Sequence, residues 1–240
     1  MTSRYSATFK AYLDLCRVSN LPSIWTNVLC AFVLATGLFA PGQYLVLAVA
    51  LSCFYLAGMC LNDVFDAEHD RAHRPSRPIP SGRVTLRGAV TFSAALLTAG
   101  FLLLLALPFR QGLLAALLLL ITIIWYDRHH KKNPLSVLLM ASCRFLVFAV
   151  TALSATGMLK LPVITAGSVQ FLYVVSISLV ARHENNRPKP FARPVIPLML
   201  AGICLVDGLI LAILAAPAWM IAGVCGALLM HAGQRMVRGD

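Results

Sequence analysis

The chain has 240 residues, 59% of them hydrophobic and 12% charged, and its formal net charge is +11. A soluble domain is about half apolar and a quarter charged, so this composition excludes an ordinary soluble protein and indicates a membrane protein. Basic charge is also typical of nucleic-acid-binding proteins, but no segment resembles a soluble module that could bind nucleic acid. We treat residues 1–240 as a single membrane domain.

Long apolar runs recur along the chain. A transmembrane helix needs about 20 apolar residues, and eight spans are predicted, at residues 19–39, 44–62, 86–107, 110–126, 134–156, 162–181, 194–214 and 217–233. The alternating pattern of a membrane β-barrel is absent from the sequence. The predicted fold class is therefore all-α, a polytopic transmembrane helical bundle of about eight spans. A short amphipathic helix over residues 7–16 is expected at the membrane surface.

Lysine and arginine are unevenly distributed between the two sides that these spans define. They gather in both termini and in the loops after the second, fourth and sixth spans, whereas Arg110 and Lys160 fall on the opposite side and Arg144 lies within a span. The positive-inside rule then places both termini and the acidic loops in the cytoplasm. We expect an integral protein of the plasma (inner) membrane.

The residues after the second span carry the strongest chemical signal. Asn62, Asp66 and Asp70 are four residues apart, with Asp63 beside them. On a helix that continues the second span they share one face, because i+3 and i+4 neighbours lie together. Clustered carboxylates repel one another unless a cation lies among them, and Mg²⁺ prefers oxygen ligands, water and substrate phosphate.

A basic, proline-rich segment follows these acids. Pro75 is predicted to end the helix, because the residue before proline avoids helical geometry. We expect Arg74 and Arg77 to follow in extended geometry, and arginine suits forked contacts with phosphate. Carboxylates and guanidinium groups at the end of a membrane helix indicate an enzyme that acts on a lipid diphosphate.

Two other interpretations of this segment are open. Its balanced charge is also typical of a solvated loop with no ligand. His69 and His73 could ligate a softer metal than Mg²⁺, although the neighbouring carboxylates are hard ligands.

These residues resemble the first signature of the UbiA-type superfamily of intramembrane prenyltransferases. The match consists of Asn62, Asp66 and Asp70, then Arg74-Pro75-Ser76-Arg77-Pro78 and Pro80-Ser81-Gly82-Arg83-Val84. Weaker matches are Arg17, Asn20 and Pro22 at the start of the first span, and Tyr126 with Lys131 or Lys132 after the fourth. The resemblance implies helices around a central cavity that opens to lipid and is capped by cytoplasmic loops.

The sequence departs from this superfamily at the second acidic motif. Members usually carry Asp-x3-Asp between the sixth and seventh spans, where this chain has Arg182-His183-Glu184-Asn185-Asn186-Arg187-Pro188. Glu184 is the one carboxylate there. Members also often have nine spans. Three segments resemble the EboC-like branch: Tyr126-Asp127, Ser142-Cys143-Arg144 and Ala181-Arg182-His183-Glu184.

The resemblance implies roles for individual residues. The expected cofactor is Mg²⁺, held by Asn62, Asp63, Asp66, Asp70 and Glu184. The residues expected to take part in catalysis are Asp66, Asp70, Glu184 and Tyr126, whose ring can stabilise a cation. The residues expected to bind substrate are Asn20, Arg74, Arg77, Lys131, Lys132, Arg144 and Arg187.

Arg144 is informative without any family. A charge in the middle of a span costs at least about 2.5 kcal/mol, so Arg144 is expected to face a cavity and to contact substrate or to pair with an acid, such as Asp207 in the seventh span. Asn20 and Asn27 could line the same cavity or form hydrogen bonds between helices. Tyr55 is expected to be a packing or interfacial aromatic residue.

The leading prediction is an enzyme that transfers alkyl groups other than methyl. It would transfer a prenyl group from a prenyl diphosphate to a small acceptor, aromatic by preference, within the membrane. The incomplete second motif supports an alternative, a divergent member that binds or translocates an isoprenoid or other lipid product. A small-solute transporter is a third candidate, although no inverted repeat is evident. The Asp-Gly-x2-Ala-Arg opening of CDP-alcohol phosphotransferases is absent.

Overall fold

A computed structural model describes residues 2–129, 135–185, 187, 191 and 194–237. All regular secondary structure in these ranges is helical. Nine α-helices and two short 3₁₀ helices follow one another in the order α1 (Thr2–Leu15), η1 (Val18–Asn20), α2 (Leu21–Thr36), α3 (Pro41–His73), α4 (Leu86–Leu105), α5 (Gln111–His129), α6 (Ser136–Thr156), α7 (Leu161–Asn185), α8 (Val195–Leu214), η2 (Pro217–Trp219) and α9 (Met220–Gln234).

The predicted spans agree with these helices to within a few residues, except where α3, α5 and α7 continue beyond them. Seven helical segments, from η1–α2 through α8, are long and apolar enough to cross a membrane. The expected eighth span corresponds to η2 and α9, and α9 has 15 residues. At about 1.5 Å per residue a helix of that length is shorter than the roughly 30 Å hydrocarbon core. The count of eight spans is therefore not confirmed.

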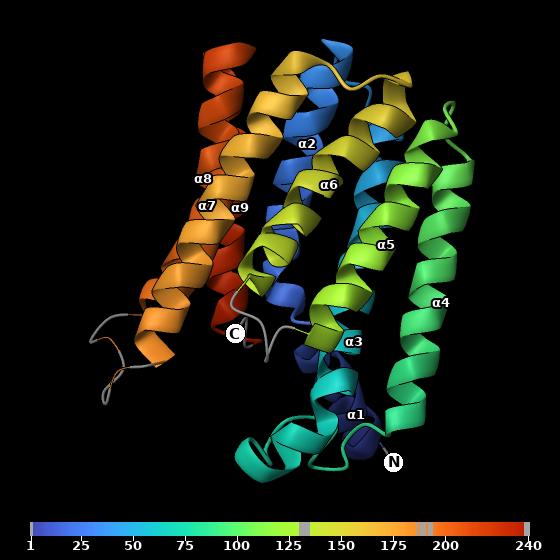
Figure 1. Cartoon of the computed structure of the whole chain (residues 1–240), viewed down its shortest axis with the longest axis vertical. Coiled ribbons are helices and arrows are strands. Elements are labelled where there is room, and N and C mark those ends of the chain that lie inside the picture. The colour runs from blue at the N-terminus through green and yellow to red at the C-terminus, as the bar shows by residue number, and fades with distance from the viewer. Residues whose placement is uncertain (1, 130–134, 186, 188–190, 192–193, 238–240) are drawn as a thin grey trace.

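Successive helices run in alternating directions, so that the bundle has two distinct ends (Figure 1). Short connections join helices at one end, over residues 37–40, 106–110, 157–160 and 215–219. At the other end, which we call the motif end, α3 and α7 finish and α4 and α8 begin. Helix α1 also lies at the motif end, as do both chain termini (Figure 1). The helix ends that flank the basic segments thus share one side of the bundle, as the charge pattern predicts.

Helix α3 continues past the apolar run and carries the acidic motif on its last turns. It extends over 33 residues and ends at His73, where Arg74 leaves helical geometry and Pro75 follows. The segment after it is compact, so the expected extended geometry is wrong. Arg77 N–H donates to the Arg74 carbonyl, Ser81 N–H to the Arg77 carbonyl and Val84 N–H to the Pro78 carbonyl. Proline fixes φ near the value that turns require, and three prolines lie within these few residues.

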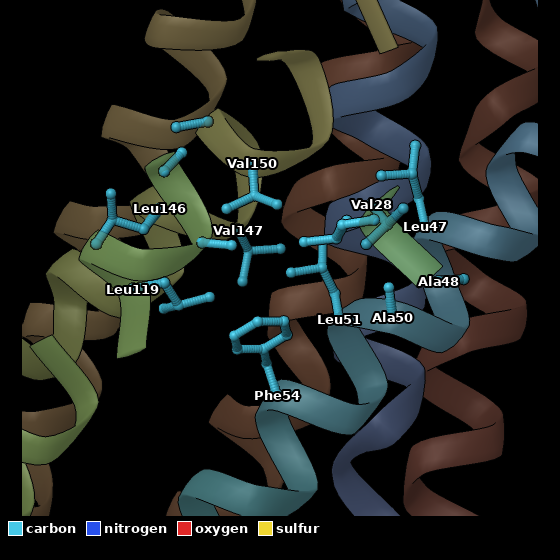
Figure 2. Packing of buried hydrophobic residues seen from close by; sticks show 14 of the residues in the cluster. Val28, Leu47, Ala48, Ala50, Leu51, Phe54, Leu119, Leu146, Val147 and Val150 are labelled. Atoms are coloured by element: carbon cyan, nitrogen blue, oxygen red, sulfur yellow. The ribbon is translucent and has the colours of Figure 1, made fainter. Parts of the chain in front are cut away.

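The core lies between α2, α3, α5 and α6. Figure 2 shows Leu51 and Phe54 of α3 pointing towards Leu119 of α5 and Val147 of α6. Phe54 also packs edge-on against Phe101 of α4, with ring centroids 4.9 Å apart. Small residues let other helices approach closely. A Cβ on Gly208 of α8 would lie 2.8 Å from the Gly223 Cα of α9, so these two backbones are in direct contact.

Candidate active site at the motif end

The acidic motif faces into the protein. The side chains of Asn62, Asp63, Asp66 and Asp70 are all buried, whereas Glu68, on the opposite face of the same helix, is exposed. This one-sided burial follows from the helical spacing of the motif.

Arginines neutralise two of these buried acids. Arg17 Nη2 lies 3.3 Å from Asp63 Oδ1, and Arg77 Nη1 lies 3.2 Å from the same oxygen. Arg77 Nη1 also lies 2.7 Å from Asp70 Oδ2. A buried charge is costly unless it is paired. The guanidinium of Arg77 therefore links the two ends of the acidic motif.

Arg17 holds an unusual backbone conformation. Its φ of 47° lies in the left-handed region, and no other non-glycine residue in the described ranges has a positive φ. Such residues are uncommon and cluster at functional sites. The conformation turns the chain between α1 and η1 and places the guanidinium against α3, where Nη1 also donates to the Met59 sulfur at 3.4 Å.

A polar cavity of about 690 Å³ opens beside the acidic motif. Its wall combines the end of α3, the turns that follow, the chain before α2, the end of α7 and the start of α8. The charged residues that line it are Asp14, Arg17, Asp63, Arg74, Arg77, Arg83 and Glu184. Four arginines face three carboxylates here, so an anionic ligand would be favoured.

A second cavity of about 140 Å³ lies deeper, inside the bundle. Apolar side chains dominate its wall, among them Leu51, Phe54, Leu119 and Val147 of the core (Figure 2). Its polar and aromatic lining residues are Arg17, Tyr55, Asn62, Tyr126, Asp127, Cys143 and Arg144. Arg17 lines both cavities, and Asn62 and Asp63 are neighbours on α3. The two cavities therefore meet at Arg17 and this turn of α3, which we call the junction.

Arg144 is held on the wall of the inner cavity by neutral groups. Its Nη1 donates to Asn27 Oδ1 at 2.8 Å and its Nη2 donates to the Ser23 hydroxyl at 3.0 Å. Its guanidinium carbon lies 6.0 Å from the centre of the Tyr55 ring. Tyr55, expected to be a packing aromatic, is thus part of the cavity wall.

Asp207 is separated from Arg144 by one side chain, that of Asn27. It accepts hydrogen bonds from Thr26, Asn27 and Gln170, at 2.7 to 2.8 Å. Asn27 stands between the two charges, because its amide nitrogen donates to Asp207 while its oxygen accepts from Arg144. The expected direct pairing of Arg144 with Asp207 is therefore not found among the described residues, because the amide of Asn27 lies between them.

A model of the UbiA prenyltransferase family matches residues 23–239 of the chain. The chain belongs to the UbiA prenyltransferase family. Its seven long apolar helices and this membership identify it as an integral membrane protein.

The chain is similar to curated and solved members of the UbiA family. The digeranylgeranylglyceryl phosphate synthase of Sulfurisphaera tokodaii is 31% identical over 127 residues, which are 52% of this chain and 45% of the relative. The chain thus spans about half the length of the curated relatives it matches.

Two solved structures share the fold. One is of a digeranylgeranylglyceryl phosphate synthase, with a TM-score of 0.65 and 20% identity over 95% of this chain and 87% of the other. A UbiA homologue from Archaeoglobus fulgidus bound to DMAPP and Mg²⁺ has a TM-score of 0.61 and 14% identity, over 92% of this chain and 87% of that one. At these identities the likeness concerns the fold.

The donor set of this UbiA-family site fits Mg²⁺ in chemistry. Carboxylate and amide oxygens are hard ligands, and Mg²⁺ is commonly held by one or two carboxylates together with water and substrate phosphate. Within the described residues, no three His, Cys, Asp or Glu side chains converge on one point. The protein could thus supply a few oxygens, and a diphosphate would complete the coordination. The softer-metal alternative gains little, because the rings of His69 and His73 stack 4.1 Å apart and His73 Nδ1 lies 3.0 Å from the His69 carbonyl oxygen.

The structure brings many of the predicted site residues together. Asp63, Arg74, Arg77 and Glu184 line the polar cavity, and Asn62, Tyr126 and Arg144 line the inner one. Asp66 and Asp70 are buried on the same face of α3 but line neither cavity; Asp70 is linked to the polar cavity through Arg77, which lies 2.7 Å from it. Glu184 also accepts a hydrogen bond from the Phe191 N–H at 3.0 Å.

Other predicted residues lie elsewhere. Asn20 is buried at the end of η1, directly before α2, and lines neither cavity. Exposed Arg187 lies 5.0 Å from the Phe191 ring centre. Lys131 and Lys132 lie outside the described residues. Their expected roles remain predictions.

Four charged residues of the site were not predicted as site residues from the sequence: Asp14, Arg17, Arg83 and Asp127. Arg17 stood out only as part of the opening segment, although a basic residue directly before a span is a recognisable signal. Asp127 accepts a hydrogen bond from Asn62 Nδ2 at 3.1 Å and so links α5 to the acidic motif. Its signal was a carboxylate at the end of a membrane helix beside Tyr126. Arg83, which ion-pairs with Asp14 at 3.4 Å, stood out only as part of the resemblance to the first signature.

Proposed function

We propose that this protein catalyses the Mg²⁺-dependent transfer of a prenyl group from a prenyl diphosphate to an acceptor within the membrane. One observation carries the proposal: an arginine-rich polar cavity and an apolar cavity meet at Arg17, beside the buried acids of α3. A prenyl diphosphate has the same two-part character, with an anionic head and an apolar chain.

Each cavity suits one part of this substrate. The diphosphate would occupy the polar cavity, where Arg17, Arg74 and Arg77 can donate forked hydrogen bonds to its oxygens. The first carbons of the prenyl chain would then pass the junction into the inner cavity, whose apolar wall excludes water.

The acids of α3 would hold the metal. Asp66 and Asp70 are the proposed principal ligands, with Asn62 and Asp63 beside them and Glu184 on the facing loop. When bound, Mg²⁺ neutralises the diphosphate and makes it a better leaving group. Because Arg77 spans Asp63 and Asp70, it is placed to exchange a carboxylate for a phosphate oxygen as the substrate arrives.

In the transfer, the bond between prenyl C1 and the diphosphate oxygen breaks and the diphosphate leaves with the electron pair. The acceptor forms a new bond to C1 and loses a proton. Tyr126 lines the inner cavity near the junction, and its ring face can stabilise the developing allylic cation. For the acceptor, the sequence favours an aromatic compound, whereas the curated relatives are named for a glyceryl phosphate product.

The charge distribution supports cytoplasmic placement of the motif end, where both termini and the long loops lie. In the plasma (inner) membrane, a prenyl diphosphate would then reach the polar cavity from the cytoplasmic side.

The test uses purified protein in lipid nanodiscs with geranyl diphosphate, Mg²⁺ and a panel of acceptors. We expect diphosphate release that requires Mg²⁺ and falls to background in Asp66→Asn and Asp70→Asn variants. Release that persists in both variants would reject the site. Tight binding of geranyl diphosphate with no release for any acceptor would favour the alternative, a divergent protein that binds or moves an isoprenoid, for which the lone Glu184 in place of a full second motif is the supporting observation.

A further inference from the structure

One residue of the inner cavity is close to the proposed metal site without belonging to it. Asp127 lies in the last turn of α5, is 5% exposed and lines the inner cavity. Its Oδ1 accepts a hydrogen bond from Asn62 Nδ2 of α3 at 3.1 Å. Asn62 is the first residue of the acidic motif, so this hydrogen bond connects α5 directly to the residues proposed to hold Mg²⁺.

A carboxylate is costly at the position of Asp127. It is buried inside a membrane bundle, where a charged group loses its hydration. It also lies near the C-terminus of α5, where the helix dipole disfavours negative charge. A neutral side chain such as glutamine or serine could accept the same amide hydrogen at a lower cost. A hydrogen bond between α3 and α5 therefore does not by itself explain an aspartate.

The charge of Asp127 determines which way the Asn62 amide faces. An ionised carboxylate accepts hydrogen bonds and cannot donate them. Only the NH₂ end of the amide can therefore face Asp127, and the amide oxygen of Asn62, Oδ1, is directed away from it. A neutral partner such as another amide could pair with either end of Asn62. The carboxylate thus selects one of two amide orientations that have almost the same shape.

The chain holds a second asparagine in the same way, and there the cation is part of the protein. Asn27 Nδ2 donates to Asp207 at 2.7 Å, and Asn27 Oδ1 accepts from Arg144 Nη1 at 2.8 Å. The carboxylate holds the nitrogen end of this amide, and the oxygen end contacts a positive charge. Asn62 and Asp127 repeat the first half of the arrangement. A cation on the oxygen side of Asn62 would complete it.

We propose that Asp127 is a positioning residue of the metal site, which holds the Asn62 amide so that Oδ1 faces the bound Mg²⁺. The proposal rests on the proposed prenyl transfer, because it concerns the metal of the same site. An amide oxygen is a hard ligand of the kind that Mg²⁺ prefers, whereas the amide nitrogen is not. The carboxylate also polarises the amide and so makes its oxygen a stronger ligand.

The experiment measures metal binding directly, so that it does not depend on turnover. Mn²⁺ replaces Mg²⁺, and its binding is followed by electron paramagnetic resonance in nanodiscs that contain the protein and geranyl S-thiolodiphosphate, a slowly reacting donor analogue. We expect Asp127→Asn to weaken Mn²⁺ binding by about 10-fold, because the new amide permits both orientations of Asn62. The matched control is Asp207→Asn, which also removes one buried carboxylate but at a position that lines neither cavity. Its effect on Mn²⁺ binding should be much smaller.

A double-mutant cycle shows whether Asp127 acts through Asn62. In an Asn62→Ala background there is no amide to orient, so Asp127→Asn should weaken Mn²⁺ binding little further.

The exchange Asn62→Asp with Asp127→Asn provides a rescue and guards against misfolding. It keeps the composition and the total charge, and the amide introduced on α5 can donate to the carboxylate introduced on α3. The second oxygen of that carboxylate remains a hard ligand. Mn²⁺ binding should therefore recover towards that of the natural protein, and thermal unfolding without ligand shows whether each variant is folded.

Several results would overturn the inference. They are the absence of Mn²⁺ binding in the natural protein, unchanged binding in Asp127→Asn, an equally large loss in Asp207→Asn, and effects of Asn62→Ala and Asp127→Asn that add fully. An exchange variant that is folded but does not regain Mn²⁺ binding would also overturn it, since the hydrogen bond would then serve only the packing of α3 against α5.

The outcomes separate this inference from the proposed function. Diphosphate release from geranyl diphosphate together with Mn²⁺ binding that does not depend on Asp127 would leave prenyl transfer intact and reject the positioning role. Mn²⁺ binding that depends on Asp127 through Asn62, without diphosphate release for any acceptor, would support the positioning role and reject prenyl transfer.

Discussion

The guanidinium of Arg77 lies 2.7 Å from the carboxylate of Asp70. A residue proposed to bind the diphosphate is thus held by a residue proposed to bind the metal. The same guanidinium contacts Asp63 at 3.2 Å, so one arginine neutralises two acids of the motif. Substrate and metal would have to arrive together, since Mg²⁺ replaces the positive charge that Arg77 gives up to phosphate.

The Arg77→Gln variant tests this relationship. We expect the KM for geranyl diphosphate to rise by about 10- to 100-fold, because a charge-assisted contact to phosphate is lost. Thermal stability without ligand should also fall, since Asp63 and Asp70 lose their shared cation. The matched control is Arg87→Gln, an exposed arginine at the start of α4 that lines neither cavity. Similar kinetic effects of the two substitutions would show that Arg77 contributes only general positive charge.

Removal of the buried acids should affect activity and metal dependence more than folding. For Asp66→Asn and Asp70→Asn we expect kcat to fall by at least about 100-fold, because charge stabilisation of the leaving group is lost. The fall in kcat is measured as the rate of diphosphate release across a Mg²⁺ titration. Glu68→Gln is the control, since Glu68 is exposed on the other face of α3. If Glu68→Gln were as damaging, the one-sided arrangement of the motif would have no functional meaning.

Glu184 tests whether a single carboxylate can replace a second acidic motif. Glutamine at this position can still accept the Phe191 N–H, so Glu184→Gln should leave the loop in place. We expect the Mg²⁺ concentration for half-maximal activity to rise by about 10-fold, because one anionic ligand is lost. An unchanged Mg²⁺ requirement would restrict Glu184 to ordering the loop.

A fourth prediction concerns packing. Alanine at Gly208 would bring its Cβ to 2.8 Å from the Gly223 Cα and force the backbones of α8 and α9 apart. We expect Gly208→Ala to reduce stability by about 1–3 kcal/mol, seen as a lower unfolding temperature in detergent. The control, Gly42→Ala, meets no atom within 4 Å and should be neutral. Equal unfolding temperatures for both variants would mean that α9 contributes little to the stability of the bundle.

The sequence predicts the helices well because hydropathy and the cost of unpaired backbone in lipid determine them almost alone. It also predicts that the acids share a face of α3, since four-residue spacing on a helix leaves few alternatives. It fails where proline-rich segments fold on themselves: residues 74–84 form turns, and Pro75 indicates only where the helix ends.

Contacts between distant helices are harder to predict. Asn27 lies between Arg144 and Asp207 because of the way α2, α6 and α8 are rotated against one another. Local sequence patterns do not determine these rotations. The same is true of Asp127, which reaches Asn62 from α5. The charge pattern did identify Arg144 and Asp207 as unusual, because any charge at that depth needs a reason.

If a prenyl donor binds as proposed, the size of the inner cavity would limit how much of its chain the protein encloses. About 140 Å³ encloses only the reactive end of a long isoprenoid, and the remainder would have to lie among the acyl chains outside the bundle. Such an enzyme would have no internal pocket that selects donors by the length of their isoprenoid chain. Donors of different length would then compete chiefly through their partitioning into the bilayer, so lipid composition would set the apparent preference as much as the amino-acid sequence does.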